Sequence, residues 1–589
     1  MAQSAPAQAA IENEANSAPK PIIWSIAGND SGGGAGLSAD ARAAQAFGVH
    51  LCPVVAAITA QNSRAVTQVQ PVPPELLDAQ LAALADDLPP AAIKTGLLGG
   101  AANIAVVARW VDRLRERGPV ALVVDPVLGA SSGAAFADAA ALAAYRDLLL
   151  PRATVVTPNR REAQMLAQLF DSQAGDVPAL SAAIQALGAQ AVAITGGDDA
   201  QAAPGWSLDW ADTPHASGWL ALPRVPTAHT HGTGCTYATS VASALALGFV
   251  AADALVLAKM ATTQALRQAY AAGQGAGPVG APLGFGTQPD LLPLMSWGDD
   301  AAFAAAPTGW RAGSDAQAAQ ENIKFDSYQR PLDGRHRPFS YQDLGVYAIV
   351  DSAQRVQQVV QAGAHTVQLR IKTPDAVDAG WYTDLQAELQ AALAACRAAG
   401  ATLVVNDHWQ LARTVAHEAA QRDAGAAQHL ALHLGQEDLD ALGTPGRADL
   451  AASGLRLGIS SHSLWELCRA RSLQPWYAAC GPVWPTLTKA MPWVPQGLDN
   501  LAWWVRMAGA PVVAIGGILE HAQLVEAARS GASAVCVVRG LGDDPARTLP
   551  GWQAALAQGR AAAPLPVPAL PHPALAGGFS AQSGALGVQ

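Results

Sequence analysis

The chain has 589 residues, half of them apolar, and a formal net charge of −11. Its length predicts about two to four domains, and an acidic balance without any Lys/Arg cluster argues against nucleic acid or an anionic membrane as a partner. Six cysteines without a C-x-x-C pair indicate reduced thiols and a cytoplasmic location, not a disulfide or zinc framework.

Residues 1–20 have neither a basic start nor an apolar segment, so we expect a disordered tail. From residue 21 to 286, short β-branched runs alternate with Ala- and Leu-rich amphipathic segments. This rhythm predicts a doubly wound α/β domain, with a mostly parallel sheet between helices and ligands beyond the carboxyl ends of the strands. The expected strands are Ile22–Ala27, Leu51–Ile58, Ala92–Thr95, Ala121–Asp125, Thr154–Thr157 and Ala191–Thr195.

The stretch Thr230-His231-Gly232-Thr233-Gly234-Cys235-Thr236 stands directly before a helical run of small residues. Glycines at a helix N-terminus expose backbone N–H groups, and the helix dipole adds positive charge, so Gly232, Thr233 and Gly234 predict a cradle for a phosphoryl group in transfer. The same field favours a thiolate at Cys235, which would take the proton from an attacking substrate hydroxyl. Taken alone, such a stretch is more often a glycine turn with a buried cysteine.

Residues 287–341 lose the periodicity, and their Ala/Gly-rich and proline-containing sequence predicts a flexible linker. From residue 342 to 560 the rhythm resumes with eight strand candidates, the tally of a (β/α)8 TIM barrel. Residues 561–589 are rich in Pro, Ala and Gly and predict a disordered tail. The barrel strands are expected at Val346–Val350, Thr366–Arg370, Leu403–Asn406, His429–His433, Arg456–Ser460, Tyr477–Cys480, Val512–Ile515 and Ala534–Val538.

Four ordered motifs give the first half a resemblance to the hydroxymethylpyrimidine/phosphomethylpyrimidine kinases of the ribokinase-like superfamily. The motifs are Ala27-Gly28-Asn29-Asp30-Ser31-Gly32-Gly33-Gly34-Ala35-Gly36 with Ala39-Asp40, Thr59-Ala60-Gln61-Asn62, Thr157-Pro158-Asn159-Arg160-Arg161-Glu162, and the stretch ending at Cys235. The resemblance implies ATP-dependent phosphorylation of hydroxymethylpyrimidine and then of its monophosphate to the diphosphate. Superfamily relatives that act on sugars or pyridoxal generally carry Asp where Cys235 stands, so the cysteine favours the pyrimidine branch.

The kinase resemblance also implies roles for single residues. Gly28, Asp40, Thr59 and Gln61 would line the pyrimidine site, and a Gln amide offers the adjacent donor and acceptor that match an aminopyrimidine edge. Asn159 and Glu162 would lie near Mg²⁺ and the phosphates. On the nucleotide side, this chain has Thr195 before Gly196 and Gly197 where the family often has Lys, which removes a point charge from the expected phosphate contact.

Six ordered motifs in the second half resemble thiamine-phosphate synthase, which joins the pyrimidine diphosphate to a thiazole phosphate and releases pyrophosphate. The motifs are Gln368-Leu369-Arg370-Ile371-Lys372, Val405-Asn406-Asp407, Leu432-His433-Leu434-Gly435-Gln436-Glu437-Asp438, Gly458-Ile459-Ser460-Ser461-His462, Gly481-Pro482-Val483-Trp484-Pro485-Thr486-Leu487-Thr488-Lys489 and Ala514-Ile515-Gly516-Gly517-Ile518. Two features depart from the family pattern: some relatives carry Ser at the positions of Cys536 and Arg539, and the segment from His417 to Gln428 is longer.

This reaction needs positive charge at the departing pyrophosphate, for which Arg370, Lys372 and Lys489 are the candidates, and hard oxygen ligands for Mg²⁺, which Asp407 and Asp438 supply. A single Asp after a strand is more often a helix cap than a metal ligand. The substrate-binding residues implied by the resemblance are Gln368, Asn406 and Ser460 for the pyrimidine diphosphate, Thr486 and Thr488 for the thiazole, and Gly516 and Gly517 for the thiazole phosphate.

Together the two halves predict a bifunctional enzyme of thiamine biosynthesis whose partners are small molecules and whose cofactors are Mg²⁺ and ATP as phosphoryl donor. Two alternatives stay open from sequence. The first is a pyridoxine-type kinase with a synthase attached, and the second is a chain in which one half is a degenerate module that senses phosphorylated compounds. A homo-oligomer is compatible with the sequence.

Overall fold

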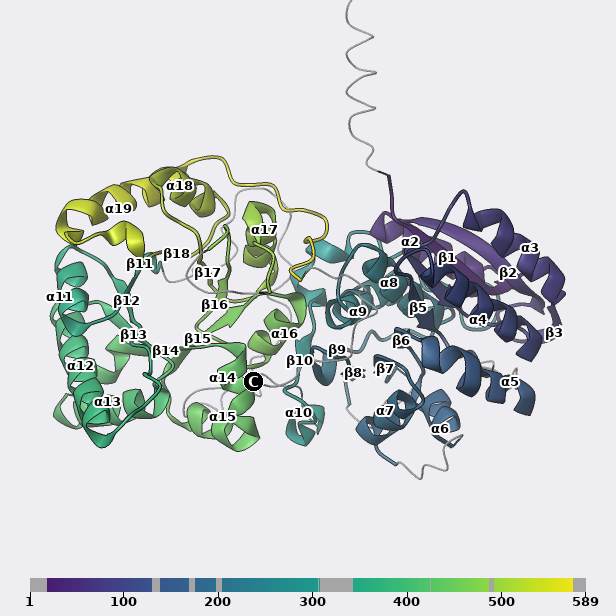
Figure 1. Ribbon diagram of the computed structural model, residues 1–589, viewed down its shortest axis with the longest axis horizontal. Helices are drawn as coiled ribbons and strands as arrows, with labels where there is room; N and C mark the ends of the chain where they lie inside the picture. Colours follow the sequence, from purple (N-terminus) through teal and green to yellow (C-terminus); the bar gives the residue numbers. More distant parts are fainter. Residues whose placement is uncertain are drawn as a thin grey trace, which may run out of the picture. The chain divides into compact units, whose positions relative to one another are not determined.

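The computed structural model describes residues 19–129, 138–168, 175–197, 204–305, 307, 343–423, 425–486 and 492–575, and the chain divides into two compact units after Gly286. None of the helices within these ranges is both long and apolar enough to cross a membrane. Each unit is described separately below, and Figure 1 labels its elements.

The N-terminal unit is a mixed sheet in which the strands follow the order β9-β8-β7-β6-β5-β4-β1-β2-β3. All six expected strands are present, with bounds shifted by up to three residues. The strands are β1 (Ile22–Asp30), β2 (His50–Gln61), β3 (Val66–Pro71), β4 (Ala92–Thr95), β5 (Ala121–Val124), β6 (Val155–Val156), β7 (Val192–Ile194), β8 (Trp206–Asp212) and β9 (Ser217–Pro223). The sequence did not predict β3, β8 and β9, which pair antiparallel at the two sides of the parallel strands.

The chain leaves β1 in one direction along the sheet, to β2, and then returns past β1 to β4. Because crossovers between parallel strands are right-handed, this reversal places α2 on one face of the sheet and α3 on the other. The reversal lies between β1 and β4, and in open α/β sheets the ligand crevice forms at such a point. The helices of this unit are α2 (Gly36–Phe47), α3 (Pro74–Ala85), α4 (Ala101–Arg115), α5 (Ala139–Ala144), α6 (Arg160–Gln168), α7 (Val177–Ala186), α8 (Thr233–Ala246) and α9 (Ala251–Arg267).

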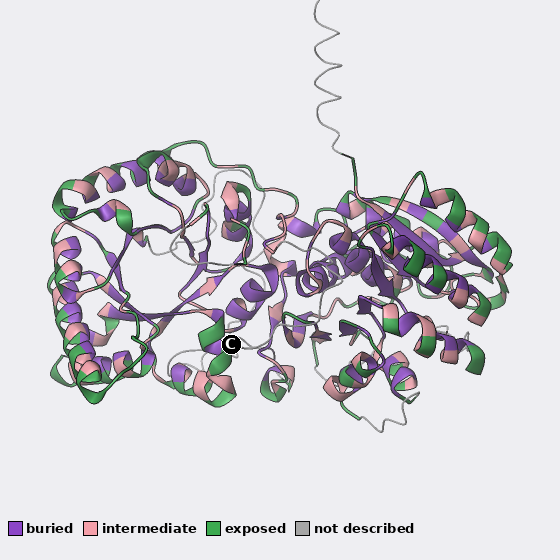
Figure 2. Ribbon diagram, viewed as in Figure 1, coloured by how far each residue is buried: buried purple, intermediate pink, exposed green. Residues whose placement is uncertain are grey.

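Helix α8 is buried along most of its length because it lies between the sheet strands β1, β4 and β5 and the helices α2 and α9. Small residues such as Ala238, Ala242 and Ala244 let the helix approach these neighbours closely. The burial colouring in Figure 2 shows the result, with purple strands and inner helix faces and green outer faces. The buried packing fixes the N-terminus of α8 at the edge of the sheet.

The second unit contains the closed barrel β11-β12-β13-β14-β15-β16-β17-β18, with all eight strands where the sequence predicts them. Every neighbouring pair is parallel, so the carboxyl ends of the strands meet at one end of the barrel. Figure 1 shows helices around the strands. The strands are β11 (Gly345–Val350), β12 (Thr366–Leu369), β13 (Thr402–Asn406), β14 (Leu430–Leu434), β15 (Arg456–Ser461), β16 (Tyr477–Cys480), β17 (Val512–Ala514) and β18 (Ala534–Val537).

Alternate strand residues fill the interior of the barrel, among them Tyr347, Val404, Tyr477 and Cys536. The helices that follow the strands bury their apolar faces against the outside of the barrel. They are α11 (Ala353–Gln361), α12 (Ala379–Ala398), α13 (Trp409–Arg422), α14 (Gln436–Ala441), α15 (Gly443–Ala452), α16 (Leu464–Ser472), α17 (Gly497–Met507), α18 (His521–Arg529) and α19 (Pro545–Ala561).

Part of the predicted linker belongs to this second unit. Residues 287–305 include β10 (Leu294–Met295) and α10 (Ala301–Ala305). The guanidinium groups of Arg447 and Arg469 lie 5.3 and 5.0 Å from the ring centroid of Trp297, and Arg471 donates to the Pro289 carbonyl at 3.2 Å. These contacts could not be predicted from the Ala-rich composition, because a single Trp and a few backbone carbonyls make them. The rest of the predicted linker, residues 306–341, lies outside the described ranges apart from residue 307.

The first part of the predicted C-terminal tail is ordered against α17. The side-chain amide of Asn500, which is fully buried, donates to the His572 carbonyl at 3.0 Å and accepts from its N–H at 2.8 Å. Val494 N–H donates to the Ala574 carbonyl at 2.8 Å. Composition predicted disorder for residues 561–575. The bonds that order this segment are made by its backbone groups, so the composition of its side chains did not reveal them. Residues 576–589 and the predicted N-terminal tail, except Pro19 and Lys20, lie outside the described residues.

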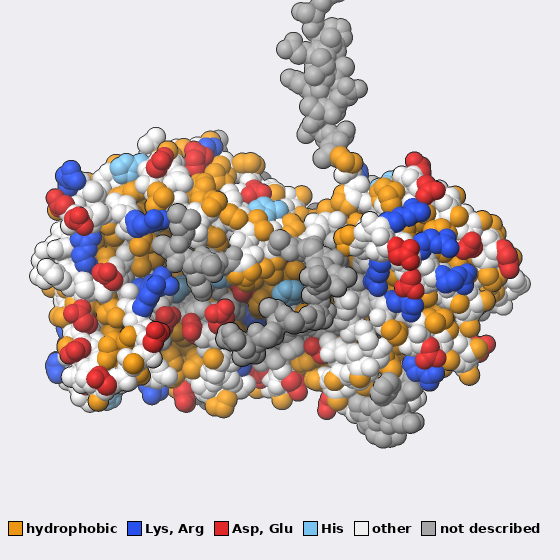
Figure 3. All heavy atoms as spheres, viewed as in Figure 1, with side chains coloured by type: hydrophobic (Ala, Val, Ile, Leu, Met, Phe, Trp, Pro, Cys, Tyr) orange, Lys and Arg blue, Asp and Glu red, His pale blue; other side chains and the backbone are white. Residues whose placement is uncertain are grey.

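On the face drawn in Figure 3, acidic and basic side chains are interspersed over the outer helices of each unit. This mixture is typical of solvated helix surfaces.

Candidate active sites

A glycine-rich loop follows β1 and is organised by one buried carboxylate, Asp30. Its two oxygens accept hydrogen bonds from the N–H groups of Gly32 at 2.8 Å, Gly34 at 3.0 Å and Ala35 at 2.8 Å, and His231 Nε2 lies 2.9 Å away. Burial raises the pKa of Asp30, but the His231 and backbone hydrogen bonds outweigh it and lower the pKa to about 2. Asp30 is therefore ionised and joins the glycine loop to the segment before α8. It was absent from the predicted site.

The two glycines at the start of α8 are required for different reasons. Gly232 has φ of 89°, and a Cβ there would lie 2.2 Å from the Gly34 carbonyl oxygen, so only glycine fits between the two loops. Gly234 is exposed and has open space where a Cβ would stand. Packing does not require glycine at this position, but its absence of a side chain leaves the first turn of α8 accessible. Thr233 Oγ1 donates to the Thr230 carbonyl at 2.6 Å, which fixes the entry into the helix.

The residues predicted to line the pyrimidine site come together at the ends of β1 and β2. Gly28 on β1 is buried, and Thr59 on β2 donates to the Asn29 carbonyl at 2.9 Å. Gln61 is partly exposed, and its Nε2 lies 3.1 Å from His231 Nε2. The same His231 Nε2 also lies 2.9 Å from Asp30 Oδ2, so this nitrogen can donate to Asp30 or accept from Gln61, but not both at once. Gln61 is the member of this group with a side-chain amide at the protein surface.

Asp40 does not line a surface, contrary to its predicted role. It is fully buried and accepts hydrogen bonds from Ser25 on β1 at 2.6 Å, Thr239 on α8 at 2.7 Å and Lys94 on β4 at 3.1 and 3.2 Å. Lys94 Nζ also lies 3.7 Å from Asp125 Oδ2. We call Asp40, Lys94 and Asp125 the buried charge cluster. The inward orientation of the Asp40 side chain could not be predicted, because an Asp close to a glycine loop is typical of a ligand contact. In the structure this side chain faces inward from α2.

Cys235 lies beside the buried charge cluster, and its environment differs from the predicted one. Burial is the largest influence and raises the pKa of the thiol to about 12, with Asp40 and Asp125 acting in the same direction and Lys94 opposing them. Burial and the two carboxylates therefore act against the effect expected of the helix field, which favours the thiolate.

The residues predicted near the nucleotide lie at the ends of β6 and β7. Asn159 Oδ1 accepts from the Glu162 N–H at 2.9 Å, and Glu162 Oε2 accepts from the Asn159 N–H at 3.0 Å, which is a reciprocal cap of α6. Thr195 N–H donates to the Pro158 carbonyl at 2.9 Å, so the two strand ends lie side by side. Gly197 is exposed, and its carbonyl accepts from Arg224 at 2.6 Å. Arg224 thus brings a guanidinium beside Gly197, two residues after Thr195.

A chain of hydrogen bonds between neutral groups crosses the interior of the barrel. Gln368 Nε2 donates to Tyr347 OH at 3.2 Å, and the hydroxyls of Tyr347 and Tyr477 are 2.7 Å apart. His433 then lies between Tyr477 OH, 2.8 Å from its Nδ1, and Ser460 Oγ, 2.9 Å from its Nε2. Burial, with Arg370 and His462 nearby, lowers the pKa of His433 to about 4, so the imidazole is neutral at pH 7. We call these five residues the barrel relay. Tyr347, Tyr477 and His433 were absent from the predicted site because aromatic residues in strands read as core.

The predicted metal ligands Asp407 and Asp438 follow adjacent strands. Asp407 directly follows β13, has φ of 66° and donates its N–H to the His433 carbonyl on β14 at 3.2 Å. Asp438 lies in the first turn of α14, and its Oδ2 accepts from the Gly435 N–H at 2.9 Å, so the cap role considered for it is present. Both residues are exposed. Among the described residues no group of three or more His, Cys, Asp or Glu side chains surrounds a potential metal position.

Two protein carboxylates are compatible with Mg²⁺ if the substrate and water provide the remaining ligands. This ion is commonly held by one or two protein carboxylates and completes its shell with substrate phosphates and water. Arg370 and Lys372 are exposed on the segment that follows β12, and Asn406, the last residue of β13, is buried. The arrangement offers cations and carboxylate oxygens at the same end of the barrel.

Gly516 and Gly517 follow β17 and have φ of 97° and 73°. A Cβ at Gly516 would lie 2.6 Å from Pro482 Cβ, and one at Gly517 would lie 2.6 Å from Trp484 Cβ. The glycines therefore let this loop pack directly against the loop after β16, which also carries the partly exposed Thr486. Thr488 and Lys489, both predicted site residues, lie outside the described residues.

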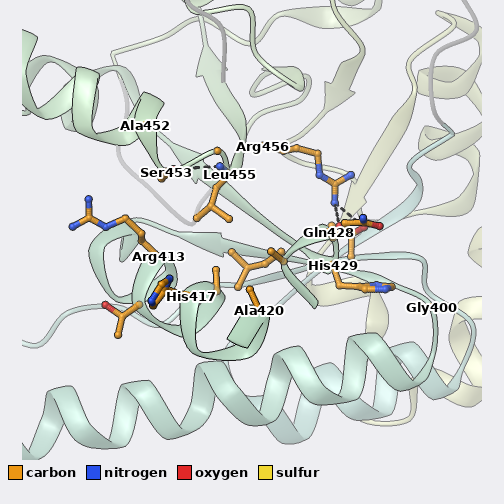
Figure 4. Close-up of a pocket in the computed structure, with 16 residues that line it drawn as sticks. Gly400, Arg413, His417, Ala420, Gln428, His429, Ala452, Ser453, Leu455 and Arg456 are labelled. Atoms are coloured by element: carbon orange, nitrogen blue, oxygen red, sulfur yellow. Dashed lines mark hydrogen bonds between the residues drawn. The ribbon is translucent and has the colours of Figure 1, made fainter. Parts of the chain in front are cut away.

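Two departures from the family pattern have structural explanations. Cys536 is 3% exposed and packs among the core residues of the barrel, so it does not reach the mouth. The longer segment from His417 to Gln428 ends α13 and forms a short helical turn. It walls a cavity of about 1030 Å³ at the amino ends of β13, β14 and β15, opposite the predicted site. Figure 4 shows Arg456 in this cavity hydrogen-bonded to Gln428, so its guanidinium is already engaged.

Comparison with known proteins matches each unit to a different family. The family profile of phosphomethylpyrimidine kinase matches residues 30–280, and that of thiamine monophosphate synthase matches residues 346–541. A hydroxymethylpyrimidine/phosphomethylpyrimidine kinase of Synechococcus elongatus is 44% identical over 44% of this chain and 97% of its own length. A probable thiamine biosynthetic bifunctional enzyme of Oryza sativa, chloroplastic, is 30% identical over 91% of this chain and 88% of its own. Among solved structures, a phosphomethylpyrimidine kinase of Clostridium difficile is 29% identical, covering 42% of this chain and all of that chain, with a TM-score of 0.36.

Proposed function

Because this chain belongs to the bifunctional thiamine biosynthetic enzymes, which join a phosphomethylpyrimidine kinase to a thiamine-phosphate synthase, we propose that each unit works at the carboxyl ends of its own strands. The first unit phosphorylates hydroxymethylpyrimidine and its monophosphate. The second unit condenses the resulting diphosphate with thiazole phosphate. The observation that carries this proposal is the gathering of each unit's motif residues at one edge of its own sheet or barrel.

In the kinase unit, Gln61 contacts the pyrimidine through its amide, while His231 and Thr59 fix the surrounding loops. ATP is the phosphoryl donor, and its transferred phosphate lies over the first turn of α8, where Gly232, Thr233 and Gly234 present backbone N–H groups to the developing charge. Asn159, Glu162, Thr195 and Gly197 lie on the nucleotide side. Cys235 accepts the proton of the attacking hydroxyl, which requires that bound substrates first favour its thiolate.

In the synthase unit, Arg370, Lys372 and Lys489 neutralise the diphosphate as it leaves the pyrimidine methylene carbon. Asp407 and Asp438 would hold Mg²⁺, which would supply further charge neutralisation for the departing pyrophosphate. Gln368, Asn406 and Ser460 orient the pyrimidine diphosphate. Thr486, Thr488, Gly516 and Gly517 bind the thiazole phosphate, whose attacking nitrogen then forms the new carbon–nitrogen bond.

The proposal is tested with the purified protein, hydroxymethylpyrimidine, ATP, Mg²⁺ and thiazole phosphate, with mass-spectrometric detection of products. We expect pyrimidine monophosphate, pyrimidine diphosphate and then thiamine phosphate to appear in this order. Omitting thiazole phosphate should leave the diphosphate as the end product. Phosphorylation of pyridoxal at a comparable kcat/KM, without turnover of hydroxymethylpyrimidine, would contradict the proposal.

A further inference from the structure

Cys235 is held between two helix N-termini. It lies one helical turn before Thr239, so both side chains point from α8 toward the sheet. Thr239 donates to Asp40 at 2.7 Å, and the Gly36 N–H, at the first residue of α2, donates to the Cys235 sulfur. Cys235 therefore shares a helix face with Thr239, whose partner Asp40 belongs to the buried charge cluster, and α8 packs on β4 and β5, which carry or precede Lys94 and Asp125.

The buried charge cluster contains one cation and two carboxylates, and the two carboxylates are not equivalent. Asp40 accepts hydrogen bonds from three side chains. Asp125, in contrast, is 5% exposed, and its Oδ2 atom has no hydrogen-bond partner among the described residues, although Lys94 Nζ lies 3.7 Å away. Burial, opposed by Lys94 and assisted by Asp40, raises the pKa of Asp125 to about 6. Asp125 is therefore the member of the cluster whose charge changes most easily near neutral pH.

Lys94 is the opposing member. Its side chain is fully buried, and despite the cost of burial, Asp40, Cys235 and Asp125 together raise its pKa above the ordinary value. A buried ammonium that stays charged exerts its full influence on a neighbouring thiol, because little solvent lies between them. Other charged or titratable groups lie nearby. Asp30 and His231 pair with each other at 2.9 Å, and Arg42 donates to the Gly33 and Gly34 carbonyls at 3.0 Å. The buried Tyr145 phenol has its pKa raised by burial and by Asp125.

We propose that Lys94 and Asp125 are opposing positioning residues for Cys235, the ammonium favouring its thiolate and the carboxylate favouring its thiol. Neutralising Asp125, by a proton or by any cation that reaches its free oxygen, then moves Cys235 toward the form that accepts a proton from substrate. The proposal rests on the role of Cys235 in the kinase. Its test uses the protein without substrates, so failure of the kinase assay and failure of this proposal are separate outcomes.

The test is the pH dependence of Cys235 alkylation by iodoacetamide, followed by peptide mass spectrometry. Cys235 is partly exposed, whereas the five other cysteines are buried, so the reagent distinguishes it. Removing the cation in Lys94→Met should move the alkylation profile to higher pH by one unit or more, which is a slowing of about tenfold below the midpoint. Removing the anion in Asp125→Asn should move the profile to lower pH. A merely structural role would not shift the two variants in opposite directions.

Lys259→Met is the matched control, because Lys259 is also a buried lysine, paired with Asp209 at 2.9 Å in the same unit. Its alkylation profile should coincide with that of the unaltered protein. Shifts of the Lys94 and Asp125 variants in the same direction, or no shift in either, would overturn the proposal. If Lys94→Met does not fold by circular dichroism, Asp125→Asn decides alone, and a profile unchanged or moved to higher pH refutes the proposal.

Discussion

The interiors beneath the two candidate sites use opposite chemistry. Under the kinase site lie full charges, with Lys94 between Asp40 and Asp125. Under the synthase site lies the barrel relay, which is made of neutral groups, while the cations Arg370 and Lys372 are exposed at the mouth. The difference follows from the reactions. A kinase base must change protonation, which buried charges control, whereas a departing diphosphate needs cations at the mouth and a pyrimidine pocket that does not quench a developing cation.

The comparison predicts that the two activities can be removed independently, and the largest effect is expected at Cys235. Cys235→Ser should lower hydroxymethylpyrimidine phosphorylation by about two to four orders of magnitude, because a hydroxyl is far harder to deprotonate than a thiol. ATP binding and condensation of added pyrimidine diphosphate should be unchanged. Steady-state assays of both half-reactions measure this, and near-normal phosphorylation by the variant would exclude Cys235 as the base.

Asp407→Asn should affect only the synthase. The amide keeps the size of the side chain, and Asn also tolerates the left-handed backbone that Asp407 adopts at φ of 66°, so the change removes mainly one negative charge. We expect the condensation rate to fall by about two orders of magnitude, equivalent to roughly 3 kcal/mol of transition-state stabilisation. The assay is thiamine phosphate formation at limiting Mg²⁺. Unchanged coupling there would show that Asp407 only ends the strand, and an equal loss of kinase turnover would show that the units are linked.

Acidification should change the stability of the two units in opposite directions. His433 has a folded-state pKa of about 4, below the ordinary value near 6.5, so the unfolded barrel binds more protons in this window and loses stability as the pH falls through it. Asp125, with a folded-state pKa of about 6, binds its proton more tightly in the folded kinase unit and adds stability as the pH falls from about 6 to 4. Each contribution is on the order of 2 kcal/mol.

These opposite trends are measured by urea unfolding of the two halves expressed separately, as residues 1–286 and 287–589. Starting the second half at Thr287 retains the segment that carries Trp297. Asp125→Asn should abolish the gain in the first half. A barrel half that becomes more stable between pH 6.5 and 4 would contradict the neutral state of His433.

The smallest effect is expected inside the barrel relay. Tyr477→Phe keeps the ring but removes the hydroxyl that joins Tyr347 to His433, so Tyr347 keeps only its bond to Gln368 and the Nδ1 atom of His433 loses its partner. We expect the free energy of unfolding of the barrel to fall by about 1–3 kcal/mol. Tyr382→Phe is the control, because Tyr382 is 51% exposed on α12 and should change stability by about 0.5 kcal/mol or less. Equal effects of the two substitutions would mean that the relay contributes no stability.

Much of the fold followed from the sequence, because buried parallel strands are β-branched runs at regular spacing. The strands β4 and β16 have the predicted bounds, and the barrel strand count is correct. The antiparallel strands β8 and β9 were missed, since their sequence, with Trp206, Trp210 and Trp219, does not resemble the parallel strands. Local sequence also could not predict the short strand β10, which packs against α16, a helix far along the chain.

The candidate sites were predicted less completely than the fold. Sequence patterns placed Gln61, Gly232 and Asp407 at strand or helix ends, as observed. They could not show that Asp40 faces inward or that Lys94 and Asp125 meet beneath Cys235, because these three residues come from three separate elements. The raised pKa of Cys235 could not be predicted from sequence either, since burial and two carboxylates from other elements raise it.

The central claim, that each unit holds one complete and independent site, is tested most directly by mixing two inactive variants. Cys235→Ser and Asp407→Asn proteins are each incubated with hydroxymethylpyrimidine, ATP, Mg²⁺ and thiazole phosphate, alone and together. Alone, the first should leave unphosphorylated pyrimidine and the second should accumulate pyrimidine diphosphate. The mixture should restore thiamine phosphate, because the diphosphate made by one variant reaches the synthase of the other. A mixture that accumulates diphosphate but makes no more thiamine phosphate than the separate variants would contradict the claim.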